Sequence, residues 1–128
     1  MVEQVRVVLE DPRFGELFGP ESRAEVPIVG RLARADGSEV LVSGQVDRLV
    51  VTAEAVLIVD YKTNRDPPTS LDAAPQAYVE QLALYRALLS RIYPDRPVRA
   101  ALVWTDVPDL MEIPAAMLDA ALARVTSA

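Results

Sequence analysis

The stretch that decides the fold is residues 39–63, EVLVSGQVDRLVVTAEAVLIVDYKT. It contains two runs rich in valine, leucine and isoleucine, 39–51 and 55–63, and each run has the composition of a β-strand. Apolar residues fall on both faces of each run, which is typical of central strands that are covered on both sides. The short break between the runs predicts a hairpin with a two-residue loop at 53–54.

That loop fixes which residues face each other. It pairs Thr52 with Ala55, and the same register carried back along the ladder sets Asp47 directly opposite Asp60. A four-residue loop gives the same pairing, whereas a three-residue loop does not. Opposed side chains lie roughly 4.5–5.5 Å apart at Cβ, so we expect the two carboxylates to be neighbours.

The neighbouring residues make this pair of carboxylates chemically interesting. Because side chains alternate along a strand, Asp60 and Lys62 share a face and Tyr61 points away. Two carboxylates facing each other in apolar surroundings are unfavourable unless something neutralises them. Oxygen ligands favour Mg²⁺, Mn²⁺ or Ca²⁺, so a divalent cation is one interpretation. The alternative is structural ion pairing of Asp47 with Arg48 or another arginine, and of Asp60 with Lys62.

Composition narrows the chemistry that the chain can perform. The 128 residues make one domain, and 51% hydrophobic with 25% charged residues are ordinary for a globular protein. Cysteine and histidine are both absent, which excludes disulfides, thiolate or imidazole zinc sites and serine–histidine triads. The net charge of −6 gives no electrostatic sign of nucleic-acid binding. Lys62 is the only lysine beside twelve arginines.

The remaining pattern predicts an α/β fold, bordering on α+β, in which helices flank a mixed sheet with an antiparallel meander. The long helix has an apolar stripe, and its place between the third and fourth strands predicts a crossover connection. On the residues alone, this stripe favours core packing for Tyr85, which lies four positions after Gln81. The predicted helices are 2–10, a turn within 14–18, 74–92 and 114–125; the predicted strands are 24–34, 39–51, 55–63 and 98–105; the stripe is Tyr78, Leu82, Tyr85, Leu89 and Ile92.

The first hairpin has its own turn signal. Asp36-Gly37 is a strong indication of a two-residue loop between strands 24–34 and 39–51. That loop would set Glu25 opposite Arg48, on the face away from Asp47, whereas a bulge or a three-residue loop would correct the register.

Three short motifs in this order resemble those of a known family. Residues 44–48 read GQVDR, residues 60–63 read DYKT, and residues 81–85 read QLALY. They resemble the G-x-x-D-R, D-Y-K-T and Q-x-x-x-Y motifs of the RecB-like branch of the PD-(D/E)XK nucleases. Residues 23–27, RAEVP, look like the C-terminal nuclease domain of AddA-type helicase–nucleases, which process DNA double-strand breaks. The resemblance covers about residues 8–125.

The resemblance implies a restriction-endonuclease-like core and a set of site residues. Asp47, Asp60 and Lys62 would be catalytic. Asp47 and Asp60, with the backbone carbonyl of Tyr61, would bind Mg²⁺, for which Mn²⁺ can substitute. Lys62 would orient the attacking water and stabilise developing charge. The positions that match supporting or substrate-contacting residues of the family are Glu25, Gln81 and Tyr85.

The resemblance also implies a wider context. Residues 1–128 would be a single nuclease domain, a C-terminal fragment of a much larger ATP-driven helicase–nuclease with exonuclease activity. Single DNA strands delivered by the helicase would be its substrate, and an AddB-type subunit its partner. The chain departs from the family in one respect: RecB-like nucleases carry a metal-ligand histidine upstream of the first strand, and this sequence has none. An isolated fragment would then be inactive.

Two alternatives remain open at this stage. The domain could be a catalytically silent scaffold or a wall of a DNA channel, or it could be a free-standing RecB-like nuclease. No run of 18 apolar residues and no signal peptide occur in the sequence, so we expect a cytoplasmic protein without a membrane partner.

Overall fold

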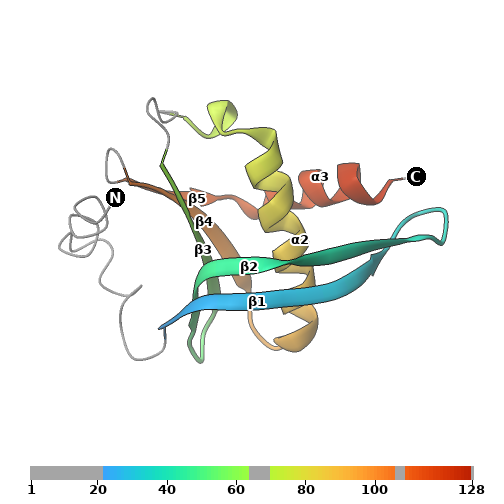
Figure 1. Ribbon diagram of the computed structural model, residues 1–128, viewed down its shortest axis with the longest axis horizontal. Helices are drawn as coiled ribbons and strands as arrows, with labels where there is room; N and C mark the ends of the chain where they lie inside the picture. Colours follow the sequence, from blue (N-terminus) through green and yellow to red (C-terminus); the bar gives the residue numbers. More distant parts are fainter. Residues whose placement is uncertain (1–21, 64–69, 106–108, 128) are drawn as a thin grey trace.

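A five-stranded mixed sheet with two long helices forms the fold, which confirms the predicted class (Figure 1). The computed structural model describes residues 22–63, 70–105 and 109–127, so the helix expected at 2–10 lies outside the described residues. The elements are β1 (Ser22–Ala33), β2 (Glu39–Val51), β3 (Val56–Lys62), the 3₁₀ turn η2 (Leu71–Ala73), α2 (Gln76–Ile92), β4 (Val98–Trp104), β5 (Asp109–Ile113) and α3 (Ala115–Thr126).

The strands lie in sequence order, β1-β2-β3-β4-β5. β1, β2 and β3 form the predicted antiparallel meander, and α2 connects β3 to a parallel β4. β5 pairs antiparallel with β4 and was not predicted. Its five residues are too few to show an alternating pattern by themselves, and pairing with β4 makes them a strand.

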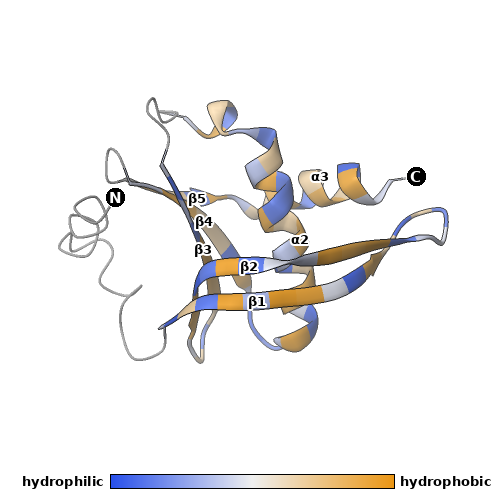
Figure 2. Cartoon of the chain, in the orientation of Figure 1, coloured by the Kyte–Doolittle hydropathy of each residue, from blue (hydrophilic) through white to orange (hydrophobic). Residues whose placement is uncertain are grey.

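The main core lies between the sheet and the helices. Figure 2 shows hydrophobic residues along the strands and the two helices that border it. β3 and β4 are buried on both faces, as their apolar sequences require, whereas most of β2 alternates between buried and exposed residues. The expectation of two doubly covered central strands is therefore correct for β3 and only for the end of β2. On α2 three residues of the predicted stripe, Leu82, Tyr85 and Leu89, are buried. Tyr78 is half-buried, and Ile92, the last residue of the helix, is 64% exposed.

The β1–β2 turn differs from the sequence prediction. Arg34 donates its backbone N–H to the carbonyl of Ser38 at 2.7 Å, which leaves a three-residue loop at 35–37. Gly37 has φ of 90°, a conformation that glycine adopts without strain and that three-residue hairpin loops require. Asp36 Oδ1 accepts hydrogen bonds from the backbone N–H and the hydroxyl of Ser38. The odd loop length shifts the β1–β2 register by one residue.

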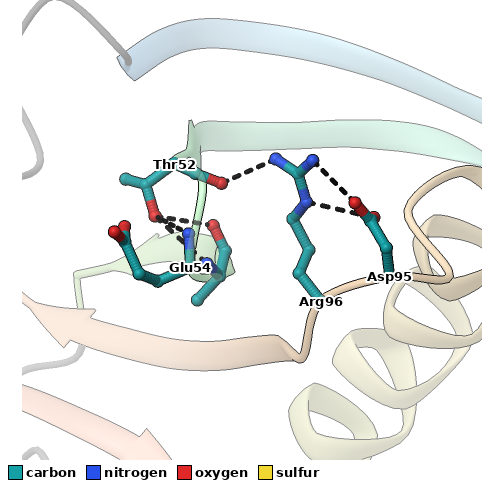
Figure 3. Close-up of polar contacts among 5 residues, drawn as sticks. Thr52, Glu54, Asp95 and Arg96 are labelled. Carbon is teal, nitrogen blue, oxygen red and sulfur yellow. Dashed lines mark hydrogen bonds and ion pairs between the residues drawn. The ribbon is translucent and has the colours of Figure 1, made fainter.

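The β2–β3 turn confirms the two-residue loop. Hydrogen bonds tie this turn to the loop between α2 and β4 (Figure 3). Thr52 N–H donates to the Ala55 carbonyl at 2.9 Å, and Thr52 Oγ1 accepts the N–H groups of Glu54 and Ala55. The Arg96 guanidinium donates to the Thr52 carbonyl at 2.7 Å and pairs with Asp95. The loop between α2 and β4 therefore holds the turn that sets the register of the candidate site.

Within the parts of the chain that the structure describes, no helix is long and apolar enough to cross a membrane.

Candidate active site

The alternation of β2 side chains between the two faces of the sheet is interrupted near Asp47. Before this residue the even-numbered Val42 and Val46 enter the core, and after it the odd-numbered Leu49 does. The ladder with β1 keeps one register on both sides of the change, but the pair formed by Glu25 and Asp47 is missing from it. Glu25 has φ of 55°, so β1 is irregular where β2 is. A local irregularity of this kind re-aims a side chain.

This register corrects the prediction for Glu25. The residue aligns with Asp47, whereas the sequence with a two-residue loop had placed it opposite Arg48. The three-residue loop at 35–37 is the physical reason. Glu25 is nevertheless exposed, and the described residues contain no group of three or more acidic, histidine or cysteine side chains that could hold a metal ion. The structure therefore does not bring Glu25 into the carboxylate pair.

Asp47 occupies the point where β2 leaves β3. The ladder between these strands ends at the Arg48–Val59 pair, and the next backbone donor on β3, the Tyr61 N–H, goes to Asp47 Oδ2 at 2.8 Å. The carboxylate therefore takes the place that a strand carbonyl holds in a continuous ladder. This hydrogen bond fixes Asp47 beside β3, where the predicted register sets it opposite Asp60.

Asp60 is only 8% exposed, and the β2–β3 register places it beside Asp47. Burial is the main reason that the pKa of Asp60 rises to about 6, and the neighbouring Asp47 carboxylate raises it further. Lys62 counteracts both effects, because its Nζ lies 2.8 Å from Asp60 Oδ2. The site therefore joins the buried Asp60 carboxylate, the half-buried Asp47 carboxylate and one ammonium group.

Lys62 is held from a second side by a residue that the sequence reasoning assigned only to the core. Its Nζ lies 4.1 Å from the centre of the Tyr78 ring, on α2. Tyr78 contacts Trp104, which is the partner of Lys62 in the β3–β4 ladder. The signal was present in the sequence: Tyr78 precedes Gln81 by three residues and Tyr85 by seven, so the three share a helix face.

Tyr61 points to the opposite face of the sheet, as predicted. There it packs against a small buried cluster of Val50, Val59 and Val103. Burial raises the pKa of the Tyr61 phenol, and Arg48 beside it lowers it in part. Because the N–H and C=O of one strand residue point to the same edge, the Tyr61 carbonyl faces the Asp47 side.

Gln81 and Tyr85 form a separate pair on α2. Gln81 Nε2 donates to the Tyr85 hydroxyl at 3.2 Å, and Tyr85 packs directly onto Gly44 of β2. Within the described residues, neither side chain makes a hydrogen bond or ion pair with the carboxylates of the site. Both line a groove of about 320 Å³ between α2, β2 and the end of α3. The Q-x-x-x-Y pair is thus fixed to the G-x-x-D-R segment by packing.

The donor set fits a hard divalent cation. Two adjacent carboxylates and a backbone carbonyl offer oxygen atoms only. Burial is the main cause of the raised pKa of Asp60 and disfavours its charged form, which a bound cation would stabilise. Mg²⁺ commonly binds through one or two carboxylates and keeps several waters, so a third protein carboxylate is not required.

The mixed sheet thus gathers two carboxylates and a lysine where β2 and β3 separate. A family model described as the PD-(D/E)XK nuclease superfamily matches residues 2–124. The chain therefore belongs to the PD-(D/E)XK nuclease superfamily, whose enzymes typically use divalent metal ions.

The other comparisons are more distant. A search among curated protein sequences found no match. A solved structure described as the crystal structure of SSO0001 is similar, with a TM-score of 0.52 and 16% identity over 97% of this chain. At this identity the likeness concerns the fold. The match covers 56% of the SSO0001 chain, so this chain spans about half of its length.

Proposed function

We propose that the chain is a Mg²⁺-dependent deoxyribonuclease domain that hydrolyses phosphodiester bonds. The observation that carries the proposal is the Asp47–Asp60 pair at the point where β2 leaves β3, in which Asp60 is buried and Lys62 lies beside it on the same face. Membership of a nuclease superfamily supports it.

The protein groups would divide the work as follows. Asp47, Asp60 and the Tyr61 carbonyl would hold the metal. The bound cation supplies Lewis acidity toward the phosphodiester and lowers the pKa of a coordinated water. Lys62 is the only lysine of the chain, and its Nζ lies 2.8 Å from Asp60 Oδ2, so it is placed to orient the water and to stabilise negative charge on phosphate oxygens.

Gln81 and Tyr85 would support the substrate rather than the metal. They line the groove between α2 and β2, and Tyr85 contacts Gly44 in the same β2 segment that carries Asp47. Glu25 aligns with Asp47 in the β1–β2 register and would act from outside the carboxylate pair.

The wider context follows from the motif resemblance. We propose that residues 1–128 form the nuclease domain of an AddA-type helicase–nuclease, working as an exonuclease on single DNA strands beside an AddB-type subunit. The net charge of −6 supports delivery of DNA by another part of the assembly, because this domain attracts phosphate poorly by its own field. The alternative context is a free-standing RecB-like nuclease, which would use the same site and need neither the helicase nor the AddB-type subunit.

A catalytically silent scaffold is the second candidate. It is favoured by one observation: the described residues contain no group of three metal-ligating side chains. The sequence also contains no histidine to complete the family's usual ligand set.

Calorimetric titration with Mn²⁺ tests the proposal. We expect binding by the wild type and its loss in Asp60→Asn, with the fold retained in both. Asp119→Asn is a matched control. The Asp119 carboxylate lies on α3, pairs with Arg86 of α2 and is 68% exposed, so we expect this variant to bind Mn²⁺ normally. Absence of binding in every variant would favour the scaffold. Cleavage of single-stranded DNA by the chain alone would favour the free-standing nuclease.

A further inference from the structure

We propose that Tyr78 is a positioning residue that keeps the Lys62 ammonium group at the active site once a metal ion has taken Asp60. This inference rests on the proposed function and extends it to a residue that none of the three motifs contains. It concerns how the single lysine of the chain is held.

Lys62 has two contacts of different kinds. One is the ion pair with Asp60, in which Nζ and Oδ2 lie 2.8 Å apart. The other is the face of Tyr78, whose ring centre lies 4.1 Å from Nζ, well within the range of a cation–π interaction. The side chain of Lys62 is 19% exposed, so water replaces neither contact readily.

The two contacts respond differently to a divalent cation. A cation bound to Asp60 competes with Lys62 for the same carboxylate and repels the ammonium group. The attraction of the aromatic face for Nζ does not depend on the charge of Asp60. Tyr78 is therefore the contact that remains when the site is loaded, which is when the lysine has to face the substrate.

The ring itself is fixed in position. Its centre lies 6.2 Å from that of Trp104, with the planes inclined by 42°. Trp104 is fully buried and pairs with Lys62 across the β3–β4 ladder. The support of Lys62 thus comes from two elements of the sheet and from α2, which packs on it.

The absence of other lysines permits a direct test. Protein labelled with ¹³C,¹⁵N-lysine gives signals from Lys62 alone. Protons above an aromatic face are shielded, so we expect the ε-CH₂ signal of Lys62 to lie upfield of free lysine in the wild type and in Tyr78→Phe. We expect it to return toward the free value in Tyr78→Leu and in Tyr78→Met, which fills more of the space of the ring.

Tyr93 supplies a matched control. It lies at the other end of α2, where its ring centre is 5.6 Å from the Arg96 guanidinium. Tyr93→Leu removes a similar interaction without touching Lys62, so its Lys62 signal should equal that of the wild type. An unchanged Lys62 signal in folded Tyr78→Leu and Tyr78→Met would overturn the proposal.

Addition of Mg²⁺ then separates this inference from the proposed function. We expect the wild-type Lys62 signal to remain upfield with Mg²⁺ bound, and a shift to the free value would overturn the role of Tyr78. Binding of Mg²⁺ is followed separately, by the backbone amide signals of uniformly ¹⁵N-labelled protein. If Mg²⁺ shifts none of these, the proposed function fails and the role of Tyr78 fails with it, although the upfield Lys62 signal still reports the contact. In DNA cleavage, Tyr78→Leu should lower kcat roughly 2- to 30-fold at unchanged KM, with recovery in Tyr78→Phe. An unchanged kcat would contradict the proposal.

Discussion

Tyr85 lies directly against the backbone of Gly44, so that a β-carbon at position 44 would be 3.1 Å from the ring carbon Cζ and closer still to the hydroxyl oxygen. The contact joins α2 to the β2 segment that carries Asp47. The first glycine of G-x-x-D-R and the tyrosine of Q-x-x-x-Y are therefore two sides of one packing contact. Tyr85 is 5% exposed, which agrees with the core role that its place in the apolar stripe favours.

Gly44→Ala should destabilise the protein by about 1–3 kcal/mol, because the ring of Tyr85 is fixed in the core and cannot yield easily. Urea unfolding followed by circular dichroism measures this change. Gly30→Ala is the matched control: its new methyl group would meet the end of the Leu88 side chain, which can rotate, so we expect a smaller loss. Equal losses in the two variants would contradict the specific contact.

Tyr85→Ala should cost about 3–5 kcal/mol, as expected when a large buried aromatic side chain leaves a cavity. Tyr85→Phe should cost much less, since the ring remains and only the hydrogen bond from Gln81 is lost. Urea unfolding of both variants measures the two losses of stability. A nearly neutral Tyr85→Ala would show that the ring is not needed for packing and serves the substrate alone.

Removal of divalent metal should make the stability of the protein depend on pH through Asp60. Its pKa is about 6 in the folded protein against 3.8 for the unperturbed group, so the folded state holds the proton more tightly. The contribution of Asp60 to the free energy of unfolding should therefore be most favourable below about pH 4. It should fall as the pH rises from about 4 through 6, and the total loss should be up to about 3 kcal/mol.

Urea unfolding in EDTA at several pH values, with the wild type beside Asp60→Asn, isolates this effect. Carboxyl groups with a lowered pKa, such as Asp36 and Glu112, act in the opposite direction but are present in both proteins. The wild type should lose more stability than Asp60→Asn between pH 4 and 7, and Mg²⁺ should restore it at pH 7. Parallel pH profiles would show that Asp60 is not the group responsible.

Lys62→Ala should leave Mn²⁺ binding in place and lower DNA cleavage by roughly 10²- to 10³-fold, because the ammonium group would stabilise charge that develops during the reaction. Calorimetry and the initial rate of cleavage measure the two properties separately. Arg99→Ala is a suitable control, since Arg99 pairs with Glu112 of β5 and should affect neither property. A Lys62→Ala variant with full activity would exclude the assigned role.

Much of the candidate site could be predicted from local sequence, because it depends on one short hairpin. Apolar runs defined β2 and β3, and a two-residue loop between them fixed the register that sets Asp47 opposite Asp60. Strand alternation then determined that Lys62 joins Asp60 and that Tyr61 turns away. These relationships require only neighbours along the chain and the period of a strand.

The first hairpin shows where such reasoning ends. Asp36-Gly37 is compatible with loops of two or three residues, and the difference of one residue decides whether Glu25 faces Arg48 or aligns with Asp47. The interruption of side-chain alternation in β2 near Asp47 could not be predicted from the sequence either. It lies where the β1–β2 ladder lacks a pair and where the β2–β3 ladder ends. β5 became a strand only through its pairing with β4.

The sequence by itself determined the class of the fold and the carboxylates and lysine of the site, because hydrophobic period and hairpin length act over a few residues. Only the tertiary structure decided what surrounds them. The Tyr78 ring beside Lys62 and the Tyr85 ring on Gly44 join segments that are distant in the chain, and the packing of α2 on the sheet brings each pair together. The raised pKa of Asp60 has the same origin, because burial by the whole fold is its largest cause.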